Sequence, residues 1–186
     1  MRVTFDLLAP IYDLFMPEPD LERLRELLRL PAPGRMLEAG GGTARVSAEL
    51  LPMVEIVVIN DLSASMLRRA KAKGPLHTVQ SYVERLPFAD GSFSRVLTVD
   101  ALHHFNDQQA AVREMTRVLA VGGRLVIEEP DIERFPVKLV ALLEKLGRMT
   151  SSFRQTEEIR SLVAAQGLEP EVVCLRDLFT CVVADK

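Results

Sequence analysis

The sequence predicts an α/β fold in which a doubly wound, mostly parallel sheet carries helices on both faces. Short apolar runs alternate with amphipathic stretches along most of the chain, as expected when each strand is followed by a helix. Several runs are almost continuously apolar, which is typical of strands buried on both faces. Three glycines, Gly40-Gly41-Gly42, follow the first run, so a sharp turn is expected there.

Length and composition indicate a single domain that comprises residues 1–186. The chain is 48% hydrophobic and 26% charged with a net charge of −3, which argues against disorder and gives no general attraction for nucleic acid. No charge-free apolar run approaches the roughly 18 residues of a membrane span, and the N-terminus does not resemble a signal peptide. Cys174 and Cys181 are too few for a zinc site or a disulfide framework, so we expect a reduced, cytoplasmic protein without metal.

Three strands are expected in the first half of the chain. Glu55–Asn60 is the clearest, because it is β-branched and its apolar run is almost unbroken. Arg35–Ala39 leads into the glycine cluster, and His77–Ser81 is the weakest of the three. A helix over Asp20–Arg29 precedes them, between two proline-containing stretches.

Helices are expected in the two intervals between these strands. The first lies around Arg45–Leu51, directly after the glycines. The second begins at Asp61 or Ser63, whose side chains can accept hydrogen bonds from the first helical turn. Its apolar residues recur at helical spacing, at Met66, Leu67 and Ala70.

The middle of the chain predicts a strand, a helix and a second strand. Phe93–Asp100 is the first strand, and Asn106 or Asp107 caps the helix that follows. One apolar stripe of this helix comprises Ala111, Met115, Val118 and Leu119. The helix is expected to stop at Val121-Gly122-Gly123, and Arg124–Glu128 follows as a strand.

The C-terminal part predicts two helices and two closing strands, which brings the number of strands to seven. Arg134–Met149 can form a helix with an inward stripe of Leu139, Leu142, Leu143 and Leu146. Thr156 caps another helix that ends at Gly167. Glu171–Leu175 and Thr180–Ala184 are joined too tightly for a helical crossover, so they are expected to be antiparallel.

The glycine cluster and Asp61 together indicate a nucleotide-type pocket. Both follow the ends of strands, and in a doubly wound sheet those points are neighbours at the carboxyl edge. An acid placed there can accept both hydroxyls of a ribose. The alternative interpretation is that Asp61 only caps the following helix.

The residues around the glycines distinguish two classes of cofactor. A dinucleotide-binding fingerprint requires a glycine at position 45, where this chain has Arg45. An acid, Glu38, instead stands two residues before Gly40. These two features favour another nucleotide cofactor over NAD.

With these residues the chain resembles the class I S-adenosylmethionine-dependent methyltransferases. Met36–Thr43 is similar to that family's first motif, which implies that Glu38, Gly40 and Gly42 meet the methionine part of the cofactor. Ile59-Asn60-Asp61 is similar to the second motif, which implies that Asp61 holds the ribose. The resemblance further implies a Rossmann-like fold, S-adenosylmethionine as cofactor and S-adenosylhomocysteine as product. Leu62 and Met66 would then lie near the adenine.

Further segments resemble the branch that includes the ubiquinone and menaquinone C-methyltransferases. In chain order they are Phe5-Asp6, Ala9–Asp13, Glu84–Phe88, Asp90–Phe93, Ala101–Phe105 and Arg117–Val126. In that branch the opening segment folds over the cofactor, which would bring Tyr12 over the methyl donor. The alternative is that Tyr12 and Phe15 only pack onto the core.

Three positions depart from the family's pattern. Tyr82 stands where family members often have an acid that contacts the adenine, so we expect Tyr82 to stack on the ring and the main chain of Val83 to replace that contact. Ala44 occupies the place of the third glycine, and Val121 replaces a proline.

No residue is predicted as a catalytic base, although several polar groups are expected near the carboxyl edge of the sheet. They are Asp100, His103, His104, Glu128, Glu129 and Asp131. Asp100 ends its strand, so it either lines the pocket or caps the next element. His103 and His104 point in different directions on a helix, so packing or hydrogen bonding is favoured over a metal pair or catalysis. One of Glu128 and Glu129 is expected to be solvated.

The remaining segments indicate the acceptor. We divide the domain into a lid and helix at 1–33, a cofactor-binding core at 34–130, and a substrate-side helix with closing strands at 131–186. The lid and the segment 130–153 are rich in Leu, Phe and Met, which favours a small, apolar or aromatic acceptor.

The basic run Arg68–Lys73 is interpreted as a solvated helix face. The oligomeric state, a homodimer included, stays open. A non-catalytic binding protein and an NAD(P)-dependent oxidoreductase are the rival hypotheses.

Overall fold

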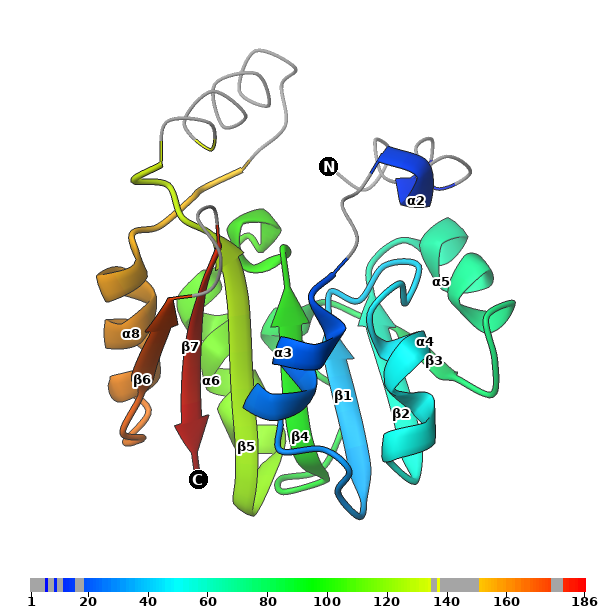
Figure 1. Cartoon of the computed structure of the whole chain (residues 1–186), viewed down its shortest axis with the longest axis horizontal. Coiled ribbons are helices and arrows are strands. Elements are labelled where there is room, and N and C mark those ends of the chain that lie inside the picture. The colour runs from blue at the N-terminus through cyan, green and yellow to red at the C-terminus, as the bar shows by residue number, and fades with distance from the viewer. Residues whose placement is uncertain are drawn as a thin grey trace.

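The computed structural model contains one seven-stranded sheet with the strand order β3-β2-β1-β4-β5-β7-β6 (Figure 1). It describes residues 6, 9, 12–15, 19–134, 137, 151–174 and 179–186. The strands are β1 (Arg35–Ala39), β2 (Ile56–Asp61), β3 (His77–Gln80), β4 (Phe93–Val99), β5 (Leu119–Pro130), β6 (Glu171–Cys174) and β7 (Phe179–Asp185). Strands β1 to β5 pair in parallel, while β7 is antiparallel to both β5 and β6. The predicted fold class is therefore confirmed.

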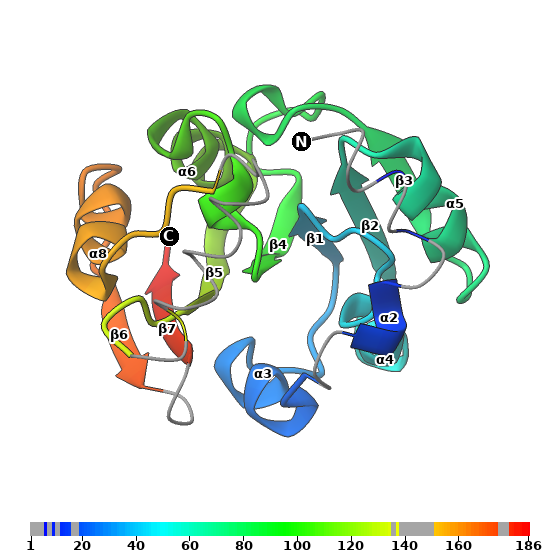
Figure 2. The same cartoon turned by 90° about the horizontal axis from the view of Figure 1, so that it is seen from above.

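Helices cover both faces of this sheet (Figure 2). The α-helices are α2 (Tyr12–Phe15), α3 (Leu21–Leu27), α4 (Ser47–Leu50), α5 (Ala64–Lys71), α6 (Gln108–Val118) and α8 (Thr156–Ala164). Three short 3-10 helices are η1 (Leu51–Met53), η2 (Val83–Arg85) and η3 (Leu102–His104). Among the described residues, no helix has both the length and the apolar character needed to cross a membrane.

Two hydrophobic cores result from the alternation of side chains along the strands. In β1, Leu37 belongs to the core that α6 and α8 cover, whereas its neighbour Met36 belongs to the core under α3, α4 and α5. Both side chains are fully buried. Because the central strands are covered on both faces, their polar residues have few places to reach solvent except at the strand ends.

The boundary between α6 and β5 differs from the prediction. The helix ends at Val118, and Leu119 already pairs with Phe93 of β4, so Val121, Gly122 and Gly123 lie within β5. The main chain of Gly122 and Gly123 bonds to Lys186, which a local sequence signal cannot show. The glycines accommodate an irregular strand start and do not end the helix.

Hydrogen bonds identify the N-terminal caps of α5, α6 and α8. Ser63 caps α5 and Asp107 caps α6, because their side chains accept from the main-chain nitrogens of Met66 and Ala110. Gln155, and not Thr156 as predicted, caps α8. Its main-chain N–H donates to the side chain of a glutamate in the first turn, which completes a capping box. The predicted helix Arg134–Met149, with its inward leucines, lies almost entirely outside the described residues.

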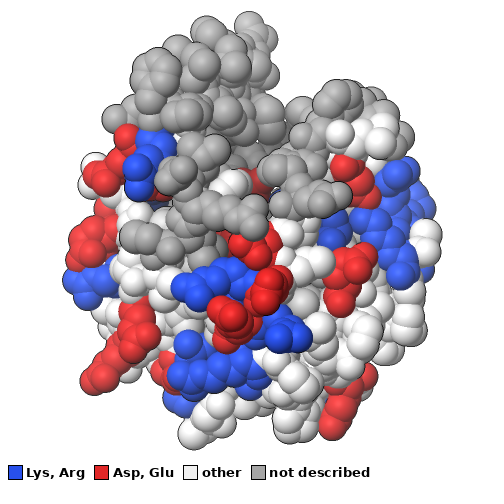
Figure 3. Space-filling model, in the orientation of Figure 1, with Lys and Arg blue, Asp and Glu red and all other residues white. Residues whose placement is uncertain are grey.

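Acidic and basic side chains alternate over the face seen in Figure 3. Among the ion pairs of the protein, Asp185 pairs with both Arg124, at 2.7 Å, and Arg29, at 3.1 Å. On α5, Arg68 and Arg69 are exposed, as predicted for a solvated helix face.

Candidate functional site

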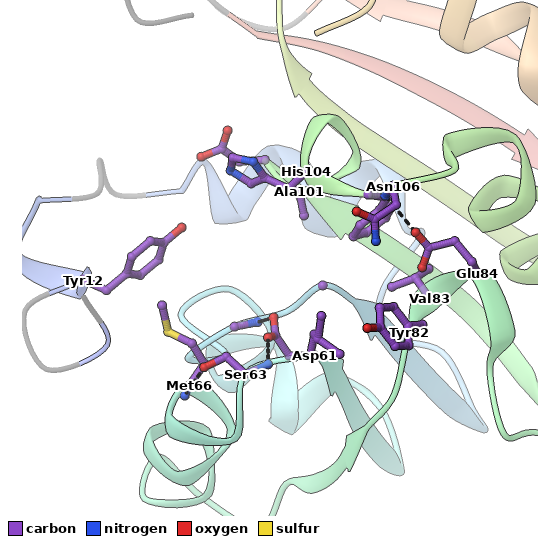
Figure 4. Close-up of a pocket in the computed structure, with 15 residues that line it drawn as sticks. Tyr12, Asp61, Ser63, Met66, Tyr82, Val83, Glu84, Ala101, His104 and Asn106 are labelled. Carbon is purple, nitrogen blue, oxygen red and sulfur yellow. Dashed lines mark hydrogen bonds between the residues drawn. The ribbon is translucent and has the colours of Figure 1, made fainter. Parts of the chain in front are cut away.

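A cleft lies at the carboxyl ends of β1, β2 and β4, beside α2 (Figure 4). It holds about 710 Å³ of space between protein atoms, open solvent at its mouth included. Its walls are formed by Tyr12, Gly40, Gly42, Asp61, Leu62, Ser63, Met66, Tyr82, Val83, Glu84, Asp100, Ala101, His104, Phe105 and Asn106. Of the residues predicted for a cofactor site, all line this cleft except Glu38.

The glycine loop between β1 and α4 forms the floor of the cleft. Gly40 has a φ of +71°, and a Cβ atom there would lie 2.9 Å from the Cβ of Ala101 and 3.0 Å from the ring of Phe105. Gly42 has a φ of +52°, but its added Cβ would meet nothing closer than Oδ2 of Asp61, at 4.0 Å. The missing side chain at Gly42 therefore leaves open space directly in front of Asp61.

Two main-chain N–H groups hold the carboxylate of Asp61. The nitrogen of Gly42 donates to Oδ2 at 3.0 Å, and the nitrogen of Ser63 donates to Oδ1 at 2.7 Å. Each oxygen keeps lone-pair capacity for a further donor. Burial raises the pKa of Asp61 above its ordinary value, and the two N–H donors oppose that shift. Since Ser63 is the N-cap of α5, Asp61 is not the cap of this helix, and its carboxylate instead joins the glycine loop to the residue that caps it.

Glu38 lies beneath the glycine loop and not in the cleft. Its side chain is 3% exposed, and a Cβ atom added to Gly41 would lie 3.0 Å from its Cγ and Cδ atoms. Burial raises the pKa of Glu38 to about 7. Its Oε2 atom has no hydrogen-bond partner among the described residues. The acid of the predicted motif thus supports the loop from below.

One end of the cleft is lined by the residues predicted to surround an adenine. Leu62 lies in the turn between β2 and α5, and Met66 lies in the first turn of α5. Tyr82 directly precedes η2, and Val83 is its first residue. Tyr82 is 54% exposed, whereas Val83 is buried. Glu84 connects this wall to the residues just before α6, because its Oε1 atom accepts a hydrogen bond from the main-chain nitrogen of Asn106 at 2.8 Å.

The opposite wall is the turn that follows β4. Asp100 has a φ of +53°, an unusual conformation for a residue other than glycine, and such residues are enriched at functional sites. Glu129, at the end of β5, holds the turn: its Oε1 atom accepts from the nitrogens of Ala101 at 2.9 Å and Leu102 at 2.7 Å. Glu128 and Glu129 are 6% and 3% exposed, so the expectation that one is solvated is wrong. The strand continues past both residues and is covered on each face.

The two adjacent histidines have different surroundings. His103 is buried, and its Nδ1 atom lies 2.6 Å from Oε2 of Glu129. His104 lines the cleft, and its Nδ1 atom lies 3.2 Å from the hydroxyl of Ser151. Burial, together with the neighbouring His103, lowers the pKa of His104 to about 3, so its ring is neutral near pH 7. The Nδ1 atoms of the two rings thus face different partners.

Tyr12 closes the remaining side of the cleft. It comes from α2, far from the other lining residues in sequence, and its hydroxyl points inward (Figure 4). Burial raises the pKa of Tyr12 well above its ordinary value, and the charge of Asp100 raises it further. The side chain of Phe15, which the alternative interpretation paired with Tyr12, lies outside the described residues.

Six residues of the cleft were not predicted to bind the cofactor, although one of them, His104, was expected near the carboxyl edge of the sheet. They are Ser63, Glu84, Ala101, His104, Phe105 and Asn106. Most of them stand in or beside segments that carry the family resemblance. Ser63 is the N-cap of α5, and the other five lie in or beside the η2 and η3 turns. A short 3-10 turn leaves no periodic pattern in a sequence, so the wall they form could not be derived from spacing.

The geometry of the cleft fits a nucleoside. An open loop of main-chain groups faces a buried acid, with apolar and aromatic walls on either side. Such a site offers hydrogen bonds to ribose hydroxyls and flat contacts to a base.

Comparison with known proteins agrees with this geometry. The chain matches the protein family described as "Methyltransferase domain" over residues 37–127. It is 35% identical to demethylmenaquinone methyltransferase of Corynebacterium efficiens, over 70% of this chain and 59% of that protein. It is 31% identical to the ubiquinone/menaquinone biosynthesis C-methyltransferase UbiE of Vibrio parahaemolyticus, over 74% of this chain and 59% of that protein. The chain thus spans about three fifths of the length of these relatives.

A solved structure shows the same fold over the whole chain. The crystal structure of a SAM-dependent methyltransferase of Thermotoga maritima superimposes with a TM-score of 0.76 at 23% identity, over 99% of both chains. The segment 37–127 runs from β1 through the glycine loop and Asp61 into β5, so the family match includes most of the cleft. The chain belongs to the class I S-adenosylmethionine-dependent methyltransferases.

Proposed function

We propose that the cleft binds S-adenosylmethionine and that the protein transfers the methyl group to a small, apolar or aromatic acceptor. The observation that carries the proposal is the relation between Gly42 and Asp61. The loop leaves open space at Gly42, and the same residue's N–H orients the carboxylate that faces that space. A glycine loop alone is common, but a loop that orients a buried acid across an open cleft suits a ribose.

The proposed roles of the lining residues follow from their places. Asp61 accepts the two ribose hydroxyls through its remaining lone pairs. The main chain of Gly40 and Gly42 contacts the methionine part, and Glu38 supports that loop from below. The adenine lies among Leu62, Met66, Tyr82 and Val83.

Asp100 and Tyr12 are proposed to face the methyl donor. A carboxylate near the positively charged sulfur stabilises it through Coulomb attraction, and an aromatic ring adds a cation–π contribution. The charge of Asp100 acts on the Tyr12 hydroxyl, so the two side chains share one region of the cleft. Together they favour a positively charged ligand at this end.

Bound S-adenosylmethionine supplies a methyl group on a sulfur that leaves uncharged, so no acid is needed to protonate it. The chain's part is to hold the acceptor close to the methyl group and in line with the bond that breaks. His104, with a pKa of about 3, is a weak base near neutral pH. We therefore propose an acceptor atom that is nucleophilic without a strong base from the chain.

Two observations support an apolar or aromatic acceptor. The described walls near His104 include Ala101 and the ring of Phe105, with few charged groups besides the acids assigned above. The two curated relatives described above are named for ubiquinone or menaquinone biosynthesis, which makes a substituted aromatic ring a reasonable first acceptor to test.

Calorimetric titration with S-adenosylhomocysteine and S-adenosylmethionine tests the proposal, with NAD as the control ligand. We expect micromolar binding of both sulfur compounds and none of NAD. Asp61→Ala removes the ribose acceptor, and we expect at least a tenfold loss of affinity, since hydrogen bonds to charged groups contribute about 1.5–3 kcal/mol each.

Asp90→Ala is the matched control for charge. Asp90 is an exposed acid that pairs with Arg117 away from the cleft, and its loss should leave the affinity unchanged. Absence of binding to the wild-type protein would exclude the proposed cofactor. If binding is found, release of labelled methyl groups to a panel of quinone-type rings then tests the acceptor.

A further inference from the structure

Two aspartates near the N-terminus, Asp6 and Asp13, contact the core of the domain. Neither aspartate lines the cleft, but Tyr12, which does, lies between them in sequence. Ala9, also between them, is 1% exposed, so this residue packs against the core.

Asp13 contacts the glycine loop and the end of α5 at the same time. Its Oδ1 atom accepts from the hydroxyl of Thr43 at 2.5 Å, and its Oδ2 atom accepts from Nζ of Lys73 at 2.6 Å. Nζ of Lys73 also lies 3.3 Å from the Thr43 hydroxyl, so the three side chains form a closed triangle. Burial alone would raise the pKa of Asp13, but the hydrogen bonds from Lys73 and Thr43 lower it, which keeps the carboxylate charged.

Asp6 contacts the opposite end of α5. Its Oδ1 atom accepts from the hydroxyls of Ser63 and Ser65, both at 2.5 Å. The main-chain nitrogen of Ser65 lies 3.4 Å from the same oxygen. The carboxylate is thus held where α5 begins, next to the wall of the cleft.

Both attachments end on the elements that orient Asp61. Thr43 follows Gly42, whose nitrogen donates to Oδ2 of Asp61, and Ser63 itself donates to Oδ1. Asp13, which directly follows Tyr12, and Asp6 therefore contact the residues beside the two backbone points that fix the proposed ribose acceptor.

We propose that Asp6 and Asp13 are positioning residues that hold Tyr12 over the cleft, so that a bound ligand leaves only after this attachment opens. The inference rests on the proposed function, because S-adenosylhomocysteine is the ligand whose exit is measured. Closure of a segment over a ligand acts mainly on the dissociation rate. A residue with a merely structural role would lower stability without acting through Tyr12.

The experiment measures S-adenosylhomocysteine association and dissociation by surface plasmon resonance on the immobilised 186-residue chain. For Asp13→Ala we expect a dissociation rate about tenfold faster and an association rate changed by less than about twofold. Tyr12→Ala should have a similar effect. The double variant should dissociate no faster than the faster single variant, because both changes remove the same restraint.

Three further proteins complete the design. Lys73→Met opens the triangle from the core side and leaves the N-terminal segment unchanged, so it should also speed dissociation. Asp13→Asn keeps an oxygen for Thr43 but loses the charge for Lys73, so its rate should lie between those of Asp13→Ala and the wild type. Glu157→Ala is the matched control: it breaks an ion pair with Arg160 on α8, remote from the cleft, and should leave both rates unchanged. Thermal unfolding of each variant confirms that it is folded.

The outcomes separate this inference from the proposed function. If the wild-type protein does not bind S-adenosylhomocysteine, the proposed function fails. If it binds, and Asp13→Ala dissociates as slowly as Glu157→Ala, the positioning role is overturned. It is equally overturned if the double variant shows the product of the two single effects, because Asp13 would then act independently of Tyr12.

Discussion

The Nδ1 atom of His103 lies 2.6 Å from Oε2 of Glu129, and both side chains are buried beneath the cleft. The other oxygen of Glu129 accepts two main-chain N–H groups from the turn after β4. One carboxylate thus joins the end of β5 to the wall that carries Asp100 and His104. The shape of that wall depends on this buried contact.

Removal of the Glu129 carboxylate should therefore destabilise the whole domain. Glu129→Ala leaves two buried N–H donors and a buried histidine without their partner, for which we expect a loss of about 3–5 kcal/mol in the free energy of unfolding. Glu129→Gln keeps an acceptor oxygen for the turn and should lose about 1–2 kcal/mol. Urea unfolding of the two variants tests this, and equal losses would show that the hydrogen bonds do not hold the turn.

Alanine substitutions at Gly42 and Gly122 distinguish loss of stability through backbone strain from loss of ligand binding. Gly42 and Gly122 have φ angles of +52° and +74°, so alanine is strained at both positions by about 1–2 kcal/mol. Only at Gly42 does the added Cβ point at Asp61, while at Gly122 it meets nothing within 4 Å. We expect both alanine variants to lose similar stability in thermal unfolding, but only Gly42→Ala to lose S-adenosylhomocysteine binding in calorimetry. Retained binding in Gly42→Ala would place the ligand elsewhere.

Much of the fold could be predicted because its signals are local. Continuous β-branched runs such as Glu55–Asn60 indicate buried strands, and alternation with helices indicates a parallel sheet. The end of α6 was predicted wrongly because Gly122-Gly123 is a strong local signal. The pairing of Leu119 with Phe93, a contact between distant residues, ends the helix earlier.

The residues of the site also fall into those that could be predicted from the sequence and those that could not. Asp61 and the glycines could be predicted because a strand end and a loop end have fixed places in this type of sheet. Glu129 could not, since its partners Ala101, Leu102 and His103 stand 26 to 28 residues earlier and no spacing rule connects them. The attachment of Asp13 to Thr43 and Lys73 is likewise a tertiary contact, 30 and 60 residues apart.

Asp100 combines an unusual backbone conformation with a place in the cleft. Asparagine adopts positive φ about as readily as aspartate, so Asp100→Asn should leave the free energy of unfolding within about 0.5 kcal/mol of the wild type. Loss of the charge should still weaken S-adenosylmethionine, whose sulfur is positive, more than S-adenosylhomocysteine, whose sulfur is neutral. Calorimetry with both ligands measures the ratio of the two affinities. An unchanged ratio would show that Asp100 does not face the sulfur.

The raised pKa of Glu128 predicts that the free energy of unfolding depends on pH. Burial raises its pKa in the folded protein to about 7, against an ordinary value of 4.5, and its Oε2 atom accepts only a long contact, 3.7 Å, from the thiol of Cys181. Between these two pH values the folded protein retains a proton that the unfolded chain has released. The contribution of protonated Glu128 to stability is therefore full below pH 4.5, falls as the pH rises towards 7, and is lost above pH 7.

Glu128→Gln removes this titration and keeps the shape of the side chain. Relative to the wild type, its free energy of unfolding should increase by up to about 3 kcal/mol between pH 5 and pH 8, from about 1.4 kcal/mol for each pH unit of the shift. Glu38, which also has a raised pKa, titrates in both proteins, so the difference between them reports Glu128 alone. Urea unfolding at the two pH values measures this difference, with the exposed Glu55→Gln as the control. Parallel pH profiles for Glu128→Gln and the wild type would mean that solvent reaches the Glu128 carboxylate, because a solvated acid has the same pKa in the folded and unfolded chain.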